Sequence, residues 1–336
     1  MGFSNRFSWS LSREGMFDEC TRRYYYHYYL SWGGWKTNAP RVVREAFKLK
    51  RLVSLSLWRG QLVHYVTSKV LQSMKVKGRI PRKEDVIGYI LERFQKQVDF
   101  SKARRYLTEP KRKGKKLNID WLALLEHEYN RELDADRIER ARQECIQGIE
   151  GLFKSPILSS IGETDPGGWF IEDLDHAEFS QSFQFQGVTV YVKTDLMFRG
   201  RDGTFNIVDW KTYRAMEPGD RNQPFSRDAQ VQLGIYSYYA VQVLQESLDL
   251  IRLYEVNLLG GGKVIEYNAN KERIEAFTGH IKTGISKLAA TLRDGDTERN
   301  EPLPLRSFSK IDNGRCRFCN FYRICKDENY PDKLSE

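Results

Sequence analysis

Three residues with the chemistry to act on a phosphate lie in two stretches that alternate like β-strands. Asp195 falls in a predicted strand over residues 188–198, and Asp209 and Lys211 end the next one, predicted over residues 205–210. Two buried carboxylates on neighbouring antiparallel strands repel each other unless a divalent cation lies between them. Lys211 shares the face of Asp209, where an ammonium group can orient a water or stabilise developing negative charge. A surface turn with a Lys–Asp pair is the alternative interpretation.

The elements around these strands carry a histidine and a glutamine–tyrosine pair. Gly60 and His64 lie in a predicted helix over residues 52–74, before the strands. Gln232 and Tyr236 lie in a predicted helix over residues 227–244, after the strands, and their spacing of four places them on one helix face. Taken singly, these residues are more typical of packing than of a functional site.

Together, in this order, these residues resemble the signature of RecB-type nucleases within the PD-(D/E)XK superfamily. The set comprises His64, Asp195, Asp209, Lys211, Gln232 and Tyr236. The resemblance implies that the histidine and both aspartates bind Mg²⁺ or Mn²⁺ together with the backbone carbonyl of Trp210. It also implies that Lys211 serves the attacking water and that the glutamine and tyrosine complete the catalytic set. Glu178 is loosely similar to a further acid one strand earlier.

The cysteines suggest a second metal site. Cys316, Cys319 and Cys325 have the spacing Cys-x2-Cys-x5-Cys, which leaves a four-ligand site one thiolate short, and Cys20 is the candidate for the fourth ligand. Four thiolates suit either a [4Fe-4S] cluster or tetrahedral Zn²⁺. Cys145 has no partner at metal spacing, so we expect it to be a structural thiol.

The surroundings of Cys20 resemble the N-terminal motif of the iron-sulfur subfamily of these nucleases. The pattern Ser-x-Ser-x4-Phe-x-x-Cys ends at Cys20, although Thr21 stands where the motif often has proline. The subfamily includes AddB-type helicase–nuclease subunits and RecB-like exonucleases of CRISPR adaptation modules. This resemblance favours the [4Fe-4S] cluster, which would staple residue 20 to residues 316–325. The aromatic run 24–29 can pack around the cluster or stack the bases of a single strand.

The remaining pattern predicts helices at the two ends of the sequence and strands between them. Residues 75–117 have weak periodicity and read as loop-like, with a basic stretch over 102–116 that either follows a DNA backbone or is a solvated loop or partner site. The other predicted helices cover residues 7–32, residues 120–153 (continuous or broken in two) and the stretch that follows residue 267 and ends at about 292. The other predicted strands cover residues 179–185, 251–258 and 263–267. The glycines at 260–262 predict a hairpin turn.

The resemblance implies an α/β fold with a restriction-endonuclease-like core, in which helices flank a central mixed sheet. We expect a single nuclease domain over residues 1–336, with the catalytic sheet core at 170–270. Residues 75–160 are expected to form a helical, partly basic insertion, and an iron-sulfur cluster is expected to join the N- and C-terminal regions.

Composition excludes several classes of protein. The chain has 336 residues, of which 40% are hydrophobic and 29% charged, which argues against disorder. No apolar run is long enough to span a membrane, and the first residues lack the apolar segment of a secretory signal, so we expect a cytoplasmic protein. The formal net charge is +9.

The expected function is metal-dependent hydrolysis of DNA phosphodiester bonds. By analogy with the family we expect an exonuclease acting on single-stranded DNA ends in DNA repair, CRISPR adaptation or antiviral defence, with a helicase or defence-system protein as a possible partner. The alternative is a non-catalytic DNA-binding or scaffold subunit that keeps the fold and the cluster.

Overall fold

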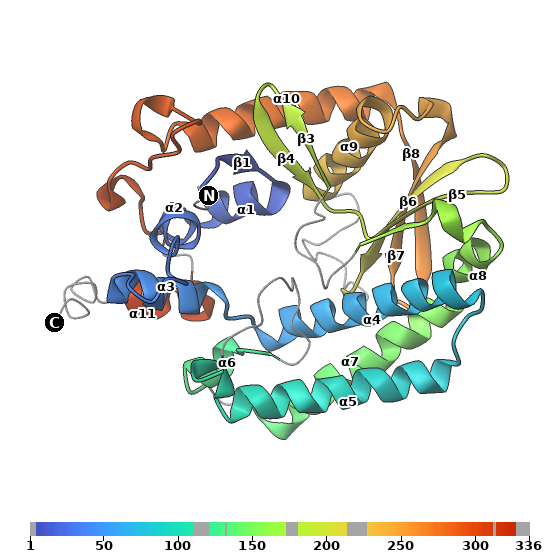
Figure 1. Cartoon of the computed structure of the whole chain (residues 1–336), viewed down its shortest axis with the longest axis horizontal. Coiled ribbons are helices and arrows are strands. Elements are labelled where there is room, and N and C mark those ends of the chain that lie inside the picture. Colours follow the sequence, from blue (N-terminus) through green and yellow to red (C-terminus); the bar gives the residue numbers. More distant parts are fainter. Residues whose placement is uncertain are drawn as a thin grey trace.

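A five-stranded mixed sheet and a smaller three-stranded sheet organise the chain (Figure 1). The computed structural model describes residues 5–109, 121–131, 133–172, 181–213, 227–311 and 314–326. The strands are β1 (Ser8–Trp9), β2 (Phe170–Ile171), β3 (Gln181–Phe185), β4 (Val188–Val192), β5 (Leu196–Arg199), β6 (Phe205–Lys211), β7 (Ile251–Asn257) and β8 (Lys263–Asn268).

The larger sheet has the order β2-β5-β6-β7-β8. Its central strand, β6, pairs antiparallel with β5 and in parallel with β7, so the sheet is mixed. β7 and β8 form an antiparallel hairpin, as predicted, and Gly261 and Gly262 in its turn have φ of 74° and 78°. Such positive φ values favour glycine, which accounts for the glycine run between the two strands.

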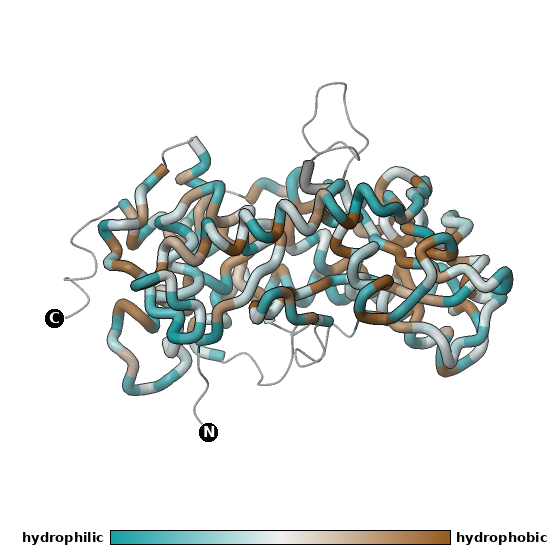
Figure 2. Tube along the Cα trace, turned by 90° about the horizontal axis from the view of Figure 1, so that it is seen from above, coloured by the Kyte–Doolittle hydropathy of each residue, from teal (hydrophilic) through white to brown (hydrophobic). Residues whose placement is uncertain are grey.

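Helices cover both faces of the larger sheet. In Figure 1, α4 (Leu55–Lys77), α5 (Lys83–Lys102) and α7 (Ala135–Lys154) lie on one side, and α9 (Arg227–Gln242) and α10 (Lys271–Ala289) lie on the other. β6 serves both layers, because Val208 and Trp210 pack with the first helices and Ile207 packs with the second. Figure 2, which views the molecule from above, shows hydrophobic and hydrophilic residues alternating along the helices.

The remaining helices are shorter and lie mostly at the two ends of the chain. They are α1 (Leu11–Glu19), α2 (Thr21–Tyr25), a π-helical turn (Tyr26–Leu30), α3 (Arg41–Lys50), α6 (Leu125–Glu128), α8 (Pro156–Gly162) and α11 (Tyr322–Lys326). α2, α3 and α11 gather at one side of the molecule, where Figure 1 shows the first and last parts of the chain side by side.

The single helix predicted over residues 7–32 is wrong. The chain first forms β1, which pairs in parallel with β4, and α1 begins only where the Ser10 side chain accepts from the backbone N–H of Arg13. At Cys20 the backbone is extended, with φ −169° and ψ 113°, so α1 ends there and α2 starts anew. The break leaves Cys20 between two helices.

The single strand predicted over residues 188–198 is also wrong. β4 belongs to the smaller sheet, whose order is β1-β4-β3, whereas β5 belongs to the larger one. The chain passes from one sheet to the other through Lys193, Thr194 and Asp195. Asp195 therefore lies at a bend directly before β5 instead of within a strand.

The region 75–117, predicted to be loop-like, contains the twenty-residue helix α5. Val86, Ile90, Phe94 and Val98 recur every four residues and are buried, which makes α5 part of the helical layer. The helix predicted over 120–153 is the broken alternative, with α6 and α7 separated by residues 129–134. The basic residues 111–116 lie outside the described residues.

The described chain thus has a mixed α/β fold with mixed sheets flanked by helices, consistent with the expected restriction-endonuclease-like core. None of its described helices combines the length and the apolar character needed to cross a membrane.

Candidate active site

Helix α4 brings His64 to the end of the larger sheet because Gly60 lets the helix approach closely. A Cβ on Gly60 would lie 2.8 Å from Oγ1 of Thr212, the residue that directly follows β6. One turn later, Nδ1 of His64 lies 3.1 Å from Oδ1 of Asp195. The four-residue spacing of the glycine and the histidine therefore has a geometric reason.

Asp195 is a buried carboxylate held from two sides. Besides its contact with His64, its Oδ2 accepts from the backbone N–H of Trp210 at 2.8 Å. The pairing of Leu196 with Val208 places Asp195 beside Asp209 across the two antiparallel strands. The two aspartates are therefore neighbours, although Asp195 precedes its strand.

Asp209 and Lys211 share one face of β6, as alternation along the strand predicts. Nζ of Lys211 lies 2.8 Å from Oδ2 of Asp209 and donates to Oε1 of Gln232 at 2.9 Å. The lysine is therefore held from both the sheet and α9.

Gln232 and Tyr236 close this set of contacts. Nε2 of Gln232 donates to the Tyr236 hydroxyl at 2.7 Å, and that hydroxyl donates to the backbone carbonyl of Lys193 at 2.7 Å. The same hydroxyl lies 3.3 Å from Oδ2 of Asp209. One face of α9 thus touches Lys211, Asp209 and the bend that carries Asp195.

The two aspartates have different electrostatic environments. Burial alone would raise the pKa of Asp195, but His64, Lys193 and the N–H of Trp210 together hold it well below its usual range. Burial raises the pKa of Asp209 to about 6. The positive charge of Lys211 lowers this pKa, whereas repulsion from Asp195 raises it further. Burial would also lower the pKa of Lys211, but its pairing with Asp209 outweighs burial and raises it. The lysine is therefore a stable cation beside two carboxylates.

A model of the PD-(D/E)XK nuclease superfamily matches residues 8–326, a span that includes all of these residues. The chain belongs to this superfamily. The search of curated proteins found no match. A solved structure titled "Crystal structure of SSO0001" is similar at 16% identity, covering 67% of this chain and 91% of that one, with a TM-score of 0.27. A similarity this weak carries no argument.

Nucleases of the PD-(D/E)XK superfamily typically use divalent metal ions. The question for this site is whether its side chains could bind such an ion. In the described ranges, no group of three or more His, Cys, Asp or Glu side chains is placed to hold a metal ion. The carboxylate oxygens instead face protein donors such as His64, Lys211 and the N–H of Trp210. The residue types nevertheless suit a divalent cation. Mg²⁺ and Mn²⁺ favour carboxylate oxygens, and a cation between Asp195 and Asp209 would relieve the repulsion between them.

Two features of this candidate site were not predicted from the sequence. Arg59 is buried, pairs with Glu144 of α7 at 3.1 Å and donates to the carbonyl of Thr212 at 2.7 Å. Glu172, buried after β2, donates through its N–H to the carbonyl of Asp195 and lies 3.6 Å from Nζ of Lys193. The sequence around Glu172 does not predict a strand, because β2 is only two residues long. Glu178 lies outside the described residues.

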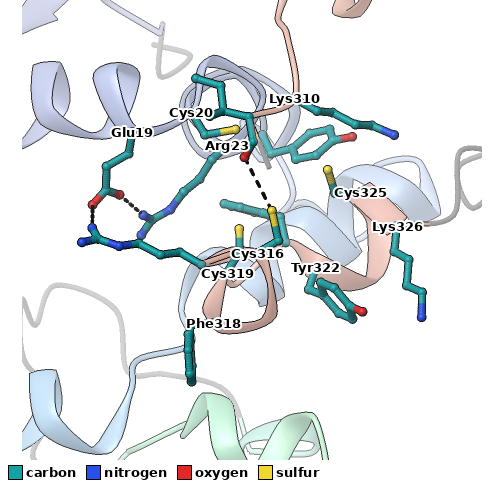
Figure 3. A pocket seen from close by; sticks show the side chains of 14 residues that line it. Glu19, Cys20, Arg23, Lys310, Cys316, Phe318, Cys319, Tyr322, Cys325 and Lys326 are labelled. Carbon is teal, nitrogen blue, oxygen red and sulfur yellow. Dashed lines mark hydrogen bonds and ion pairs between the residues drawn. The ribbon is translucent and has the colours of Figure 1, made fainter. Parts of the chain in front are cut away.

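The candidate cluster cysteines line one cavity at the side of the molecule where the chain ends meet. The cavity has a volume of about 630 Å³. Figure 3 shows the side chains of Cys20, Cys316, Cys319 and Cys325 around it, together with Arg23, Lys310 and Lys326. The four thiols are free.

The chemistry of this cavity fits a thiolate-bound metal, although the sulfurs are not in metal-binding geometry. Burial raises the pKa of Cys319 to about 11, and burial also raises that of Cys325, so both favour the protonated thiol in this arrangement. Cys145 lies apart from the cavity, fully buried among the apolar residues of α4 and α7, where burial raises its pKa to about 12. That position suits a structural thiol.

The aromatic run 24–29 is mostly interior. Tyr24, Tyr26 and Tyr29 are buried, and the ring of Tyr26 packs on Phe321 at 5.6 Å between ring centres. These three buried rings are therefore not free to stack bases, and the packing of the run around a cluster stays a prediction.

Proposed function

We propose that this protein is a metal-dependent deoxyribonuclease of RecB type that degrades single-stranded DNA from its ends. The observation that carries the proposal is the closed ring of contacts among Asp209, Lys211, Gln232 and Tyr236. Asp195, held by His64 and by the N–H of Trp210, lies beside this ring on the neighbouring strand. Such an arrangement concentrates two carboxylates and one fixed cation at the end of a strand.

The roles of the residues follow from their contacts. We assign His64, Asp195, Asp209 and the Trp210 carbonyl as the groups that would hold Mg²⁺ or Mn²⁺. When bound, such an ion lowers the pKa of a coordinated water and neutralises charge on the phosphate. Lys211 keeps its proton because of Asp209, so it can donate to the attacking water or to a phosphate oxygen. Gln232 and Tyr236 fix the position of that ammonium group.

The test is cleavage of end-labelled single strands in Mg²⁺ or Mn²⁺, with EDTA as the reference. Asp209→Ala and Lys211→Ala should each reduce cleavage by roughly a thousandfold or more while leaving DNA affinity within a few fold. Asp249→Ala, at an exposed position, is the matched control. Linear strands should be degraded and circular ones spared. Wild-type DNA binding without metal-dependent cleavage would instead favour a non-catalytic DNA-binding or scaffold subunit.

We also propose that the four cysteines of the cavity hold a [4Fe-4S] cluster, as in the iron-sulfur subfamily. Support comes from their convergence on one cavity from positions 20 and 316–325. Protein purified without oxygen should contain iron and sulfide and should absorb visible light. Cys20→Ser should lose the iron, the sulfide and the visible absorbance. Cys145→Ala is the control and should keep the iron. Stoichiometric zinc without iron would transfer the site to the Zn²⁺ alternative.

The setting of this activity is part of the same proposal. We infer a cytoplasmic role in DNA repair, CRISPR adaptation or antiviral defence, with a helicase or defence-system protein as partner, on the resemblance of the sequence motifs alone. Identification of the proteins that co-purify from the native host tests it, and recovery of the nuclease without any such partner would count against it.

A further inference from the structure

Two exposed tryptophans stand on a well-formed turn between the π-helical turn and α3. Trp32 is 38% exposed and Trp35 is 43% exposed, and their rings meet edge to face with centres 5.0 Å apart. Exposing two of the largest apolar side chains together is costly in water, so a pair of this kind indicates a contact surface.

The turn is held rigidly against α3. Gly33 has φ of 81°, and backbone hydrogen bonds join Gly34 to Ser31 at 3.2 Å and Lys36 to Gly33 at 2.9 Å. Gly34 packs so closely on α3 that a Cβ there would lie 2.4 Å from Cβ of Phe47. The tryptophan rings are therefore presented in a fixed arrangement, which reduces the entropy lost when a ligand binds.

Positively charged residues without an acidic partner follow the tryptophan pair along the chain. Arg41 and Arg44 are exposed and lie one turn apart on α3, and Phe47, a further turn along, contacts Trp35 with ring centres 5.8 Å apart. Among the described residues, none of the cations Lys36, Arg41, Arg44, Lys50 and Arg51 lies within ion-pairing distance of a carboxylate.

The single acid in this stretch does not compensate those charges. Glu45 is engaged by Arg323 at 2.8 Å and by Lys48 at 3.7 Å. The patch therefore combines flat aromatic faces with unpaired cations. That combination matches a flexible polyanion with π faces along its length, which describes a single-stranded nucleic acid.

We propose that this patch, the tryptophan–arginine surface, binds the single-stranded DNA substrate. It consists of Trp32, Trp35, Lys36, Arg41 and Arg44. Bases stack on the two indoles and the phosphates lie along the cations of α3. The proposal deepens the proposed function, because it rests on single-stranded DNA being the substrate, and it places a binding surface on the turn and helix between the Cys20 segment and α4.

The first experiment measures binding of a labelled single strand in EDTA, where cleavage is blocked. Trp32→Ala/Trp35→Ala should weaken binding by roughly tenfold or more, as expected for lost stacking. Trp32→Phe/Trp35→Phe keeps the aromatic faces and should bind within a few fold of wild type. Tyr191→Ala, which removes an aromatic ring that is 46% exposed on β4, should change nothing. A thermal melt confirms that each variant is folded.

The second experiment measures the salt dependence of the same binding. Arg41→Gln/Arg44→Gln should flatten the slope of log affinity against log salt by about 1.4, at roughly 0.7 per lost phosphate contact. Arg293→Gln/Arg299→Gln removes the same total charge from two exposed arginines that pair with acids, and it should leave the slope unchanged.

The outcomes separate the surface from the catalytic proposal. If the alanine pair binds like wild type and the slope stays constant in Arg41→Gln/Arg44→Gln, the tryptophan–arginine surface is not the DNA path, even if the wild type cleaves DNA. In that case an acidic protein partner becomes the better occupant. If the variants weaken binding but the wild type never cleaves, the surface stands and the nuclease assignment fails.

Discussion

Lys211 illustrates how single residues define this site. Its ammonium group contacts a carboxylate on its own strand and an amide on α9, so two separate elements fix one cation. The sequence predicted that Lys211 and Asp209 share a face, since that follows from strand alternation alone. It could not predict the contact with Gln232, because the helix and the strand meet only through the folding of the whole sheet.

Tyr236 offers a sharper test at the residue scale than the catalytic groups do. Tyr236→Phe deletes the hydroxyl that donates to the Lys193 carbonyl and accepts from Gln232. If the site acts as proposed, kcat should fall roughly ten- to a hundredfold with little change in KM, because the reacting groups are misplaced and not removed. Steady-state kinetics on a labelled single strand measures this effect.

Tyr238→Phe is the control for that change. Tyr238 lies on the same helix, half-buried, and its ring packs on Phe183 with centres 5.0 Å apart. Because the ring is retained, its variant should keep wild-type kcat. Equal kcat values for Tyr236→Phe and wild type would mean that the tyrosine only fills space.

At the scale of elements, local pattern located most helices and strands but misjudged where they break. The apolar residues over 188–198 run on through β4 and β5, although the two strands belong to different sheets. β4 buries alternate side chains, whereas β5 buries three in a row, Leu196, Met197 and Phe198. Which partner a strand pairs with is a non-local property, so no local pattern reveals the change of sheet. In α5, charged residues between Val86, Ile90, Phe94 and Val98 weaken the apolar pattern of these four buried positions, so the helix was not predicted.

The contact between α4 and the end of β6 can be tested at Gly60, because this glycine sets the distance between the two elements. Gly60→Ala would place a Cβ 2.8 Å from Oγ1 of Thr212, so the two elements must separate or Thr212 must turn. We expect cleavage to fall by roughly tenfold or more as His64 moves relative to Asp195. Combining it with Thr212→Ala, which removes the clashing oxygen, should restore much of the activity.

The control for this helix substitution lies on α5. A methyl group added at Gly88 would meet no other described atom within 4 Å, so Gly88→Ala should raise the free energy of unfolding by about 0.5–1 kcal/mol through helix propensity and leave cleavage unchanged. Cleavage rates and denaturant unfolding of the three variants decide the matter. Unchanged cleavage in Gly60→Ala would show that this contact does not position the histidine.

At the scale of the whole molecule, the two ends of the chain are joined by direct contacts as well as by the proposed cluster. Nε of Arg22 donates to the carbonyl of Phe308 at 2.7 Å, and Nδ2 of Asn320 donates to the carbonyls of Leu49 and Leu52 at 3.1 and 2.6 Å. The sequence predicted this meeting of the ends only through its cysteines. The hydrogen bonds could not be foreseen, because they join residues more than 260 positions apart.

Glu128 connects several parts of this junction and should make its stability depend on pH. Its buried carboxylate accepts from Arg323 at 2.8 Å and from the Tyr106 hydroxyl at 2.9 Å, and it lies 3.6 Å from Nζ of Lys48. Burial alone would raise the pKa of Glu128, but these partners together lower it. A carboxyl with a lowered pKa stabilises the fold above its unfolded pKa, about 4.3, and loses that contribution as pH falls through the folded value.

Glu128→Gln should therefore lower the free energy of unfolding at neutral pH by about 1–3 kcal/mol, since it removes the charge that Arg323 and Lys48 share. The difference from wild type should shrink below about pH 4, because the wild-type carboxyl then takes up a proton and loses the same charge. Urea unfolding at a series of pH values measures it, with exposed Glu275→Gln as the control. A difference that stays constant down to pH 3 would show that the carboxylate charge contributes nothing to the junction, leaving hydrogen bonding and packing to hold the two ends together.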